Sequence, residues 1–289
     1  MAVVDAGSFV GAADVLEMSK PAVSRYVNDL EVRLNVRLLH RTTRKLSLTE
    51  EGEIFYHRCQ ELLAGVDAAE AEISSRSGEA SGVIKINAPM SFGIKHLAPL
   101  WGEFQSAHPK VVLDVTLADR QVDLVEEGYD MAIRIARLPS SSLISRKLSS
   151  TRVLLCASPE YLQKAGTPTH PADLVKHRLL SYTLWVEGDE WAFNGPDGRV
   201  SVKVNPSIRT NNGDTCRIAA LNHQGIILQP TFLVGDDLRS GALVEILPEF
   251  RSIDFSIYVI YPSRKHLSPK VRLMVDFLME AFRQPRWVN

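Results

Sequence analysis

The chain has 289 residues, 45% of them hydrophobic, and a formal net charge of −1 at pH 7. This length predicts about two domains, each with a core of its own. The near-neutral charge excludes a protein that coats nucleic acid non-specifically, because such proteins are basic throughout. No stretch approaches the roughly 18 apolar residues of a membrane span, and the start lacks the basic and apolar regions of a secretion signal. These features predict a cytoplasmic protein.

Ser8 is a suitable N-cap for a first helix, which is expected to run to about Met18. The residues expected to face inward are Phe9, Ala12, Ala13 and Leu16. Because the two alanines are small, we expect the next helix to approach this one closely.

A second helix is predicted from about Lys20. Ser19 can cap its start, and Pro21 fits the first turn, where a missing N–H costs nothing. An apolar stripe at helical spacing consists of Val23, Val27, Leu30 and Leu34, and the residues off this stripe are Lys20, Ser24, Arg25, Asn28 and Glu31. One face therefore packs, and the other is free to contact a partner. Asn35 tolerates the left-handed conformation in which the chain leaves a helix.

A short hairpin is predicted between Leu39 and Leu48, and its polar residues are Arg41, Thr42, Thr43, Arg44, Lys45 and Ser47. Cations and hydroxyls of this kind suit phosphate oxygens. From Ser19 to Thr49 the chain carries seven Lys or Arg residues against two acids, a local balance of +5. Positive charge concentrated in one module is typical of a winged helix-turn-helix that binds DNA. The alternative is a solvated amphipathic helix followed by a turn.

A third, long helix is predicted from Thr49 to about Arg76. Thr49 can cap it, and Glu50 and Glu51 lie in the first turn, where the helix dipole favours carboxylates. Spacings of four and three alternate along a seam that consists of Phe55, Cys59, Leu62, Val66, Ala69 and Ile73. A seam of this kind favours a coiled-coil dimer, and the alternative is a helix that packs on the core of its own domain.

Small and polar residues at 74–82 have the composition of a flexible hinge and mark a domain boundary. Beyond it, apolar runs alternate with helical patterns, which predicts the α/β class with a mainly parallel sheet. The expected strands are VIKIN, VVLDVTL, MAIRI, VLLCA, RLLSY, GIILQ and FSIYVIY, with a hairpin through Trp191–Val204. The expected helices lie at 97–107, 122–127, 159–165, 214–222, 231–238 and 269–282.

Three ordered motifs resemble the amino-terminal module of LysR-type transcriptional regulators: S-K-P-A-V-S-R, then L-E-x-R-L-N-V-R-L-L-H-R-T-T-R, then L-S-L-T-E-E-G. The layout of residues 83–289 resembles the effector domain of the same family, so the resemblance covers nearly the whole chain. Two departures stand out. Asn35 replaces the usual Gly, and the segment before Val3 is shorter than usual, so the first helix of the DNA-binding domain is expected to be largely absent.

The resemblance implies a winged helix-turn-helix at 1–49, a dimerising linker helix at 50–76, a hinge at 77–82 and an effector-binding domain at 83–289. That domain would resemble a periplasmic binding protein, with one α/β subdomain formed by 83–157 plus 262–289 and the other by 158–261. The implied partners are double-stranded DNA, a small-molecule effector, a second copy of the chain in a homodimer or homotetramer, and RNA polymerase.

Residues at the start of a recognition helix reach base edges in the major groove. We therefore expect Ser19 to cap this DNA-binding element and Lys20, Pro21, Ser24 and Arg25 to read bases. The hairpin residues Arg41, Thr42, Thr43 and Arg44 should contact phosphates or the minor groove.

Ligands of open α/β folds bind beyond the carboxyl ends of strands, near helix N-termini. The residues at such positions here, which look like the inducer pocket of the family, are Ser91, Phe92, Arg134, Asn212, Pro230 and Thr231. Helix N-termini and an arginine, with few fixed anions, predict an anionic effector. Taken singly, Ser91 and Thr231 could instead be helix caps, and Arg134 could form a surface ion pair.

An enzyme or solute-binding protein whose N-terminal region serves oligomerisation is the alternative function, but the motifs G-x-S-x-G, P-loop, G-x-G-x-x-G and H-E-x-x-H are all missing. His170, Asp173 and His177 form only a weak metal pattern and are expected to be surface residues. The three cysteines, Cys59, Cys156 and Cys216, are far apart and predict buried thiols. Cys216 could be a redox sensor, but the sequence offers no second cysteine nearby that would resolve a sulfenic acid. We predict no metal, no cofactor and no enzymatic activity.

Overall fold

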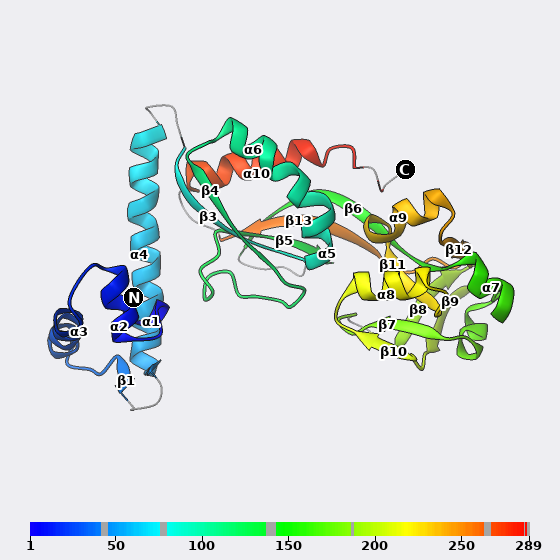
Figure 1. Cartoon of the computed structure of the whole chain (residues 1–289), viewed down its shortest axis with the longest axis horizontal. Coiled ribbons are helices and arrows are strands. Elements are labelled where there is room, and N and C mark those ends of the chain that lie inside the picture. Colours follow the sequence, from blue (N-terminus) through cyan, green and yellow to red (C-terminus); the bar gives the residue numbers. More distant parts are fainter. Residues whose placement is uncertain are drawn as a thin grey trace. The chain divides into compact units, whose positions relative to one another are not determined.

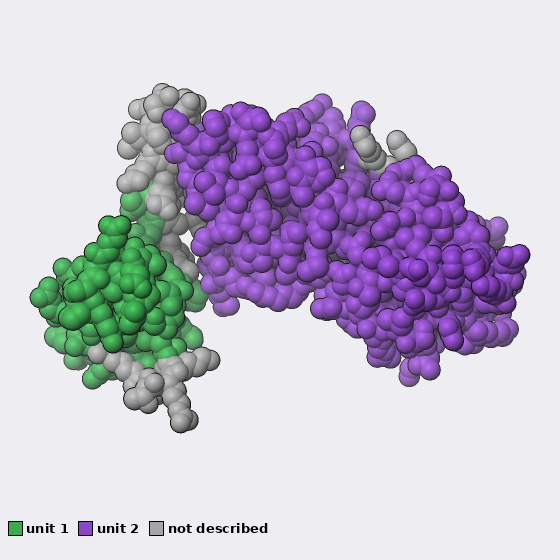
Figure 2. Space-filling view, viewed as in Figure 1, with its two compact units in different colours: residues 1–77 green, residues 78–289 purple. Residues whose placement is uncertain are grey.

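The computed structural model describes residues 1–41, 46–75, 80–136, 143–185, 188–262, 267–285 and 287. The chain forms two compact units, Met1–Ser77 and Gly78–Asn289 (Figure 2). Among the described helices, none combines the length and the apolar character needed to cross a membrane.

In its described residues, the first unit has helices α1 to α4 and a hairpin of the strands β1 and β2 (Figure 1). In chain order these are α1 (Ala2–Asp5), α2 (Phe9–Val15), α3 (Lys20–Leu34), β1 (Leu39–Arg41), β2 (Leu46–Leu48) and α4 (Glu50–Ser75). Their small core consists of Val3, Ala12, Ala13, Val23 and Leu39. The two buried alanines of α2 belong to this core together with Val23 of α3, as the sequence predicts.

Side-chain caps fix where the helices of this unit begin. The Ser8 hydroxyl accepts a hydrogen bond from the Gly11 N–H at 3.0 Å, and the Ser19 hydroxyl accepts one from the Ala22 N–H at 3.4 Å. Such caps satisfy N–H groups that have no partner within the helix. Asn35 ends α3 in the left-handed conformation, at φ 55° and ψ 33°.

Helix α2 is shorter than predicted. It ends at Val15 instead of Met18, because Glu17 adopts a positive φ of 52° that a right-handed helix does not allow. Leu16, which we expected to face inward, is consequently exposed.

Helix α4 begins as expected after Thr49, whose hydroxyl accepts from the Gly52 N–H at 2.9 Å and donates to the Arg37 carbonyl at 2.6 Å. The cap thus also holds the segment that enters the hairpin. Within the single chain, Leu62 is 71% exposed and Val66 is 52% exposed.

The second unit is built on one nine-stranded sheet with the order β10-β7-β11-β6-β13-β5-β3-β4, and β12 also pairs with β6. The strands are β3 (Gly82–Ala88), β4 (Val111–Leu117), β5 (Met131–Ala136), β6 (Ile144–Ala157), β7 (Leu179–Tyr182), β10 (Ile208–Thr210), β11 (Ile226–Pro230), β12 (Val244–Ile246) and β13 (Asp254–Tyr261). A separate hairpin consists of β8 (Glu190–Gly195) and β9 (Gly198–Lys203), which turns at Pro196-Asp197 within the predicted stretch.

The sheet is mixed, whereas the sequence pattern predicts a mainly parallel one. Strand β3 pairs in parallel with β4 and β5, and β7 pairs in parallel with β10 and β11. The long strands β6 and β13 run antiparallel to each other and to their neighbours, and they join the two parallel groups. The first half of β6, together with β10 and β12, was missed, because these polar or three-residue segments carry little apolar signal.

The helical segments of this unit are α5 (Met90–Phe92), η1 (Gly93–Leu97), η2 (Ala98–Leu100), α6 (Trp101–Ala107), α7 (Pro159–Ala165), η3 (Pro171–Lys176), α8 (Gly213–Leu221), α9 (Thr231–Ser240) and α10 (Pro269–Ala281). Helical structure thus begins at Met90, before the predicted start at Leu97, and it includes a π-helical turn. The helix predicted at 122–127 is wrong, since this stretch has no helix and Asp123 caps a turn by accepting from the Val125 and Glu126 N–H groups.

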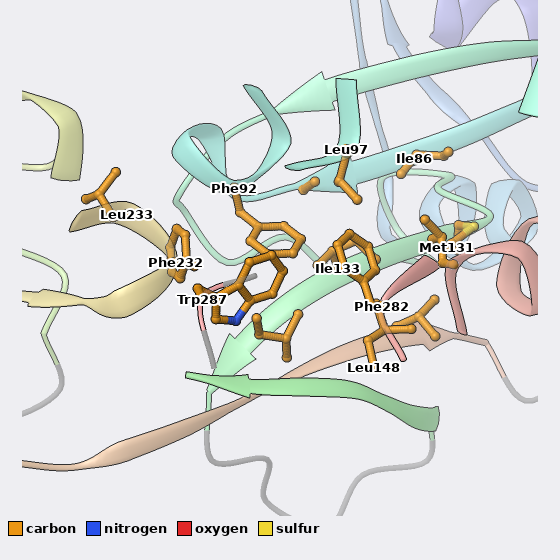
Figure 3. Packing of buried hydrophobic residues seen from close by; sticks show 14 of the residues in the cluster. Ile86, Phe92, Leu97, Met131, Ile133, Leu148, Phe232, Leu233, Phe282 and Trp287 are labelled. Atoms are coloured by element: carbon orange, nitrogen blue, oxygen red, sulfur yellow. The ribbon is translucent and has the colours of Figure 1, made fainter. Parts of the chain in front are cut away.

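The main core lies between the sheet and its helices, and its aromatic part is shown in Figure 3. Phe92 makes edge contacts with Phe232 and Trp287, with ring centroids 5.4 and 5.7 Å apart. Trp287 also donates from its indole nitrogen to the Ser150 carbonyl at 3.1 Å. Burying an aromatic side chain contributes about 1.5–3 kcal/mol. Phe92 ends α5, which follows β3, and Phe232 lies in the first turn of α9, which follows β11, so this cluster holds the ends of two strands together.

Candidate functional site

The start of α3 presents an accessible polar surface. Ser19, Lys20, Pro21 and Arg25 are exposed, and Ser24 is half-buried. The Arg25 guanidinium carbon lies 5.6 Å from the centroid of the Tyr26 ring, an arrangement that orients the cation without neutralising it. The Ser19, Lys20, Ser24 and Arg25 side chains have donors for base edges or phosphates, whereas Pro21 can offer only apolar contact.

The hairpin that follows α3 is anchored by a residue whose role the sequence analysis missed. Glu31, expected on the free face of the helix, is buried, and its carboxylate accepts from the Leu38 and Leu39 N–H groups at 2.9 and 3.2 Å. Hydrogen bonds to a charged acceptor contribute about 1.5–3 kcal/mol each. Glu31 therefore fixes the start of the hairpin relative to α3.

The tip of the hairpin lies outside the described residues. This applies to Thr42, Thr43 and Arg44, while Arg41 is described in its backbone only, as the last residue of β1. The paired part has a defined register, with Leu39 opposite Leu48.

A cavity of about 450 Å³ lies in the second unit, where the ends of several strands meet. Four of the six residues predicted for an effector site line it: Ser91, Phe92, Arg134 and Pro230. Further lining residues that the sequence analysis did not single out include Asp119, Arg120, Tyr182, Trp185, Gly213, Gln229, Phe232 and Phe255.

Several polar atoms in the cavity wall are buried without a hydrogen-bond partner among the described residues. They are Ser91 Oγ, Arg134 Nη2, Trp185 Nε1 and Gln229 Nε2. Ser91 is 6% exposed and Gln229 is 2% exposed. A buried polar group that lacks a partner costs about 1–3 kcal/mol. Four such groups around one cavity indicate that the cavity is built for a ligand that accepts hydrogen bonds.

Ser91 and Gln229 converge over Gly213, the first residue of α8. A methyl group added at Gly213 would stand 3.3 Å from the Gln229 side-chain oxygen and 3.8 Å from Ser91 Oγ. Gln229 also contacts the buried Cys216 thiol, which opposes the rise in the pKa of that thiol caused by burial. Because sulfur is a weak acceptor, this contact leaves the amide N–H capacity largely unfilled.

Arg134 supplies a cation to the cavity wall. Its Nη1 donates to the Asn87 side-chain oxygen at 2.7 Å and to the Ile133 carbonyl at 3.0 Å. Burial lowers the pKa of this guanidinium, although an arginine stays charged at neutral pH. An anion in the cavity would replace some of the hydration that Arg134 has lost.

One acid in the wall was not foreseen. Asp119 accepts from the Met90 N–H at 2.8 Å and hydrogen-bonds the Tyr182 hydroxyl. Burial raises the pKa of Asp119, the negative charge of Asp214 raises it further, and the hydrogen bonds to Met90 and Tyr182 oppose the rise. The sequence predicts few fixed anions near the ligand site, and Asp119 has to be counted as one of them. Neither the residue type nor its spacing in the sequence signals its place in the cavity.

The remaining two predicted effector residues do not belong to the cavity lining. Asn212 caps α8 by accepting from the Thr215 N–H at 3.0 Å, and the Thr231 hydroxyl lies 3.0 Å from the Thr151 hydroxyl. Their neighbours Gly213 and Phe232 line the cavity instead. Helix capping, which was the alternative role for Thr231, is instead performed by Asn212, at the start of α8.

The residues of the weak metal pattern have structural partners. His170 accepts from the Ala172 N–H at 3.2 Å, and Asp173 accepts from the His170 N–H at 3.2 Å, which together form a capping box. His177 contacts the Tyr161 hydroxyl at 3.3 Å. Among the described residues, no group of three or more His, Cys, Asp or Glu side chains is placed to hold a metal ion.

Comparison with known proteins identifies both units. A family model described as the LysR substrate binding domain matches residues 77–283. A second, described as a bacterial regulatory helix-turn-helix protein of the lysR family, matches residues 1–53. The transcriptional regulator CrgA of Neisseria meningitidis is 36% identical over 279 residues, which cover 96% of this chain and 93% of that protein. An uncharacterised HTH-type transcriptional regulator of Haemophilus influenzae is 36% identical over 269 residues, 93% of each chain.

Solved structures agree with these matches. The structure of CrgA from Neisseria meningitidis superposes with a TM-score of 0.66 at 34% identity, covering 98% of this chain and 96% of that one. The full-length virulence activator AphB of Vibrio cholerae superposes with a TM-score of 0.65 at 31% identity, covering 97% and 96% of the two chains. The α/β unit thus has the periplasmic-binding-protein-like fold predicted for it. The chain belongs to the LysR family of DNA-binding transcription regulators.

Proposed function

We propose that this regulator responds to a small anion bound in the cavity lined by Ser91, Phe92, Arg134 and Pro230. The observation that carries the proposal is the set of buried donors around one cavity that have no partner in the described part of the chain, together with the Arg134 cation. An anion accepts hydrogen bonds at several atoms and would satisfy these groups together. Gln229 and Gly213 join the proposed site, in place of Asn212 and Thr231.

On the DNA side, we propose that Ser19 caps the recognition helix while Lys20, Pro21, Ser24 and Arg25 read bases in the major groove. The exposure of the first turn of α3 supports this assignment. Arg41, Thr42, Thr43 and Arg44 would contact phosphates or the minor groove from the hairpin.

We propose that the linker helix dimerises the chain through the seam of Phe55, Cys59, Leu62, Val66, Ala69 and Ile73. The large exposed fractions of Leu62 and Val66 in the single chain support this, because exposed apolar side chains at coiled-coil spacing are stabilised by a partner helix. A homodimer or homotetramer would then engage paired DNA half-sites and RNA polymerase.

The proposed division of labour is a winged helix-turn-helix at 1–49, a linker helix at 50–76, a hinge at 77–82 and an effector domain at 83–289. Within the effector domain, 83–157 plus 262–289 would form one subdomain and 158–261 the other. Gly82 is already the first residue of β3, so the hinge would end one residue earlier. Relatives of the chain are named as transcriptional regulators, and we propose that it has no enzymatic activity and acts in the cytoplasm, where bacterial DNA lies.

The test measures binding to the DNA upstream of the gene, with and without candidate anions, in the parent protein and in the Arg134→Ala variant. We expect an effective anion to change the parent's DNA affinity and to have little effect on the variant. Retardation of this DNA at physiological salt also separates a regulator from a solute-binding protein. If only neutral or cationic compounds alter DNA binding, the proposed effector class is wrong.

A further inference from the structure

The cavity is much larger than an anionic group alone requires. Its volume of about 450 Å³ lies within the roughly 300–1,000 Å³ of sites that enclose drug-sized ligands. The hydrogen-bonding groups occupy only part of its wall. The effector must therefore have a body that fills the rest.

The anion-binding end of the cavity is defined by Ser91, Gln229 and Gly213. Ser91 Oγ and Gln229 Nε2 are buried and unpaired among the described residues, and both side chains converge over Gly213 at the start of α8. The N–H groups in the first turn of this nine-residue helix add a favourable potential for negative charge. A methyl group at position 213 would collide with Leu233 and would stand 3.3 Å from the Gln229 side-chain oxygen and 3.8 Å from Ser91 Oγ, so the glycine leaves room beside the Ser91 hydroxyl.

The other part of the wall is flat and apolar. The Trp185 and Phe255 rings stack with centroids 5.7 Å apart and only 10° between their planes, and Tyr182 meets the Trp185 ring edge-on at 5.6 Å. Ile135 and Leu184 also line the cavity. Aromatic rings stack favourably in offset or edge-to-face arrangements, worth about 0.5–1.5 kcal/mol beyond the area that they bury.

The same wall disfavours a second charge or several hydroxyls on the ligand. The Asp119 carboxylate, held by the N–H of Met90 next to Ser91 and by the Tyr182 hydroxyl, repels every negative charge on a ligand, so a dianion is disfavoured more strongly than a monoanion. The hydroxyls of a polyol facing Ile135 or Leu184 would lose their hydrogen bonds to water without replacement.

We infer that the effector is a monocarboxylate with an aromatic or similarly flat apolar body, an inference that rests on the proposed anion site. Its carboxylate accepts hydrogen bonds from the Ser91 hydroxyl and from Gln229 Nε2. Its body lies against Trp185 and Phe255.

Titration calorimetry on the full-length protein tests this with four probes: 2-naphthoate, the neutral 2-naphthamide, the non-planar cyclohexanecarboxylate and the dianion succinate. We expect 2-naphthoate to bind about tenfold or more tightly than each of the other three, since one charge-assisted hydrogen bond or one aromatic wall is worth about that factor. Ser91→Ala and Trp185→Leu should each weaken 2-naphthoate binding by a similar factor. The matched control is Ser106→Ala on α6, whose hydroxyl bonds the Gly102 carbonyl outside the cavity; this variant should bind as the parent does.

The outcomes separate this inference from the proposed function. Preferential binding of succinate, with loss in Ser91→Ala, contradicts the flat monocarboxylate and leaves the anion site standing. Unchanged 2-naphthoate affinity in Trp185→Leu also contradicts the inference. If 2-naphthamide binds best, or if none of the probes binds, both the inference and the proposed anionic effector fail.

Discussion

Gly213 and Leu233 approach each other so closely that a methyl group on the Gly213 α-carbon would stand 2.9 Å from Leu233 Cδ2. Real side chains essentially never come so near, so any larger residue must displace Leu233 or the start of α8. Both residues line the cavity. A larger side chain at position 213 would therefore change both the packing of α8 against α9 and the shape of the proposed ligand site.

We expect Gly213→Ala to lower the free energy of unfolding by about 1–3 kcal/mol, the usual cost of overpacking, and to weaken anion binding. Chemical denaturation and calorimetry measure the two effects. Gly102→Ala is the matched control, because an added methyl group there meets nothing within 4 Å. In the helix α6 it should stabilise the protein by up to about 1 kcal/mol. Equal behaviour of the two variants would contradict the close approach at Gly213.

Removing the cation of the cavity should weaken anion binding specifically. Arg134→Ala is expected to cost about 1.5–3 kcal/mol of binding free energy, the value of a hydrogen bond to a charged group. Arg146→Ala is the control, because Arg146 pairs with Asp276 at the surface, at 2.9 Å, and is not part of the cavity lining. Titration calorimetry should show a loss in the first variant only; unchanged affinity in Arg134→Ala means that Arg134 is structural.

The pKa of Asp119 is raised mainly by burial, so this group gains its proton at a higher pH than an ordinary aspartate. Its ionised form opposes an anion in the cavity, whereas its protonated form does not. Anion affinity should therefore increase as the pH falls through the Asp119 pKa, while the probe itself stays ionised. Asp119→Asn should bind more tightly at neutral pH and lose this part of the pH dependence. A parent and a variant with parallel pH profiles would show that Asp119 does not sense the ligand.

Features determined by neighbouring residues could be predicted from the sequence. Ser8, Ser19 and Thr49 cap helices as expected, since a cap involves residues only three positions apart. Ser91 and Arg134 were placed near a ligand site because Ser91 follows the end of β3 and Arg134 lies in the second half of β5.

Contacts between distant residues were not predictable in this way. Glu31 binds N–H groups seven and eight positions further along, so its burial follows from the hairpin and not from the helical stripe. Asp119 and Gln229 reach the cavity through the register of the sheet, which periodicity alone does not determine. The mixed sheet arises from the long antiparallel pair β6 and β13. The first half of β6 is polar and resembles loop sequence.

Self-association should depend on the seam of α4, in which Leu62 and Val66 are exposed in the single chain. Replacing Leu62 and Val66 together with glutamates is expected to remove apolar burial worth several kcal/mol at about 25 cal/mol per Å², and to weaken dimerisation and DNA binding together. Glu53→Lys is the control, because it changes charge on the same helix away from the seam. Sedimentation measures the assembly; a double variant that assembles like the parent would place the interface elsewhere.

The DNA-binding module should show two kinds of loss. Arg25 is exposed at the start of the recognition helix and is able to hold guanine O6 and N7 bidentately. Arg25→Ala should therefore cost about 1–3 kcal/mol on the cognate site and relax discrimination at one base pair. Arg44→Ala, at a position that we expect to bind phosphate, should weaken binding to all sequences alike and flatten the slope of log affinity against log salt by about one unit.

Affinities on cognate and scrambled operators across a salt series distinguish the two roles. A base-reading arginine loses affinity mainly on the cognate site, because scrambled DNA never offered the guanine contact. A phosphate-binding arginine loses affinity on both DNAs and releases fewer counterions, so its salt slope changes. Glu31→Gln adds a separate check, since weakening the carboxylate that binds Leu38 and Leu39 should loosen the hairpin and reduce the contribution of Arg44 without changing base preference. A uniform loss in Arg25→Ala would instead assign this residue to a phosphate.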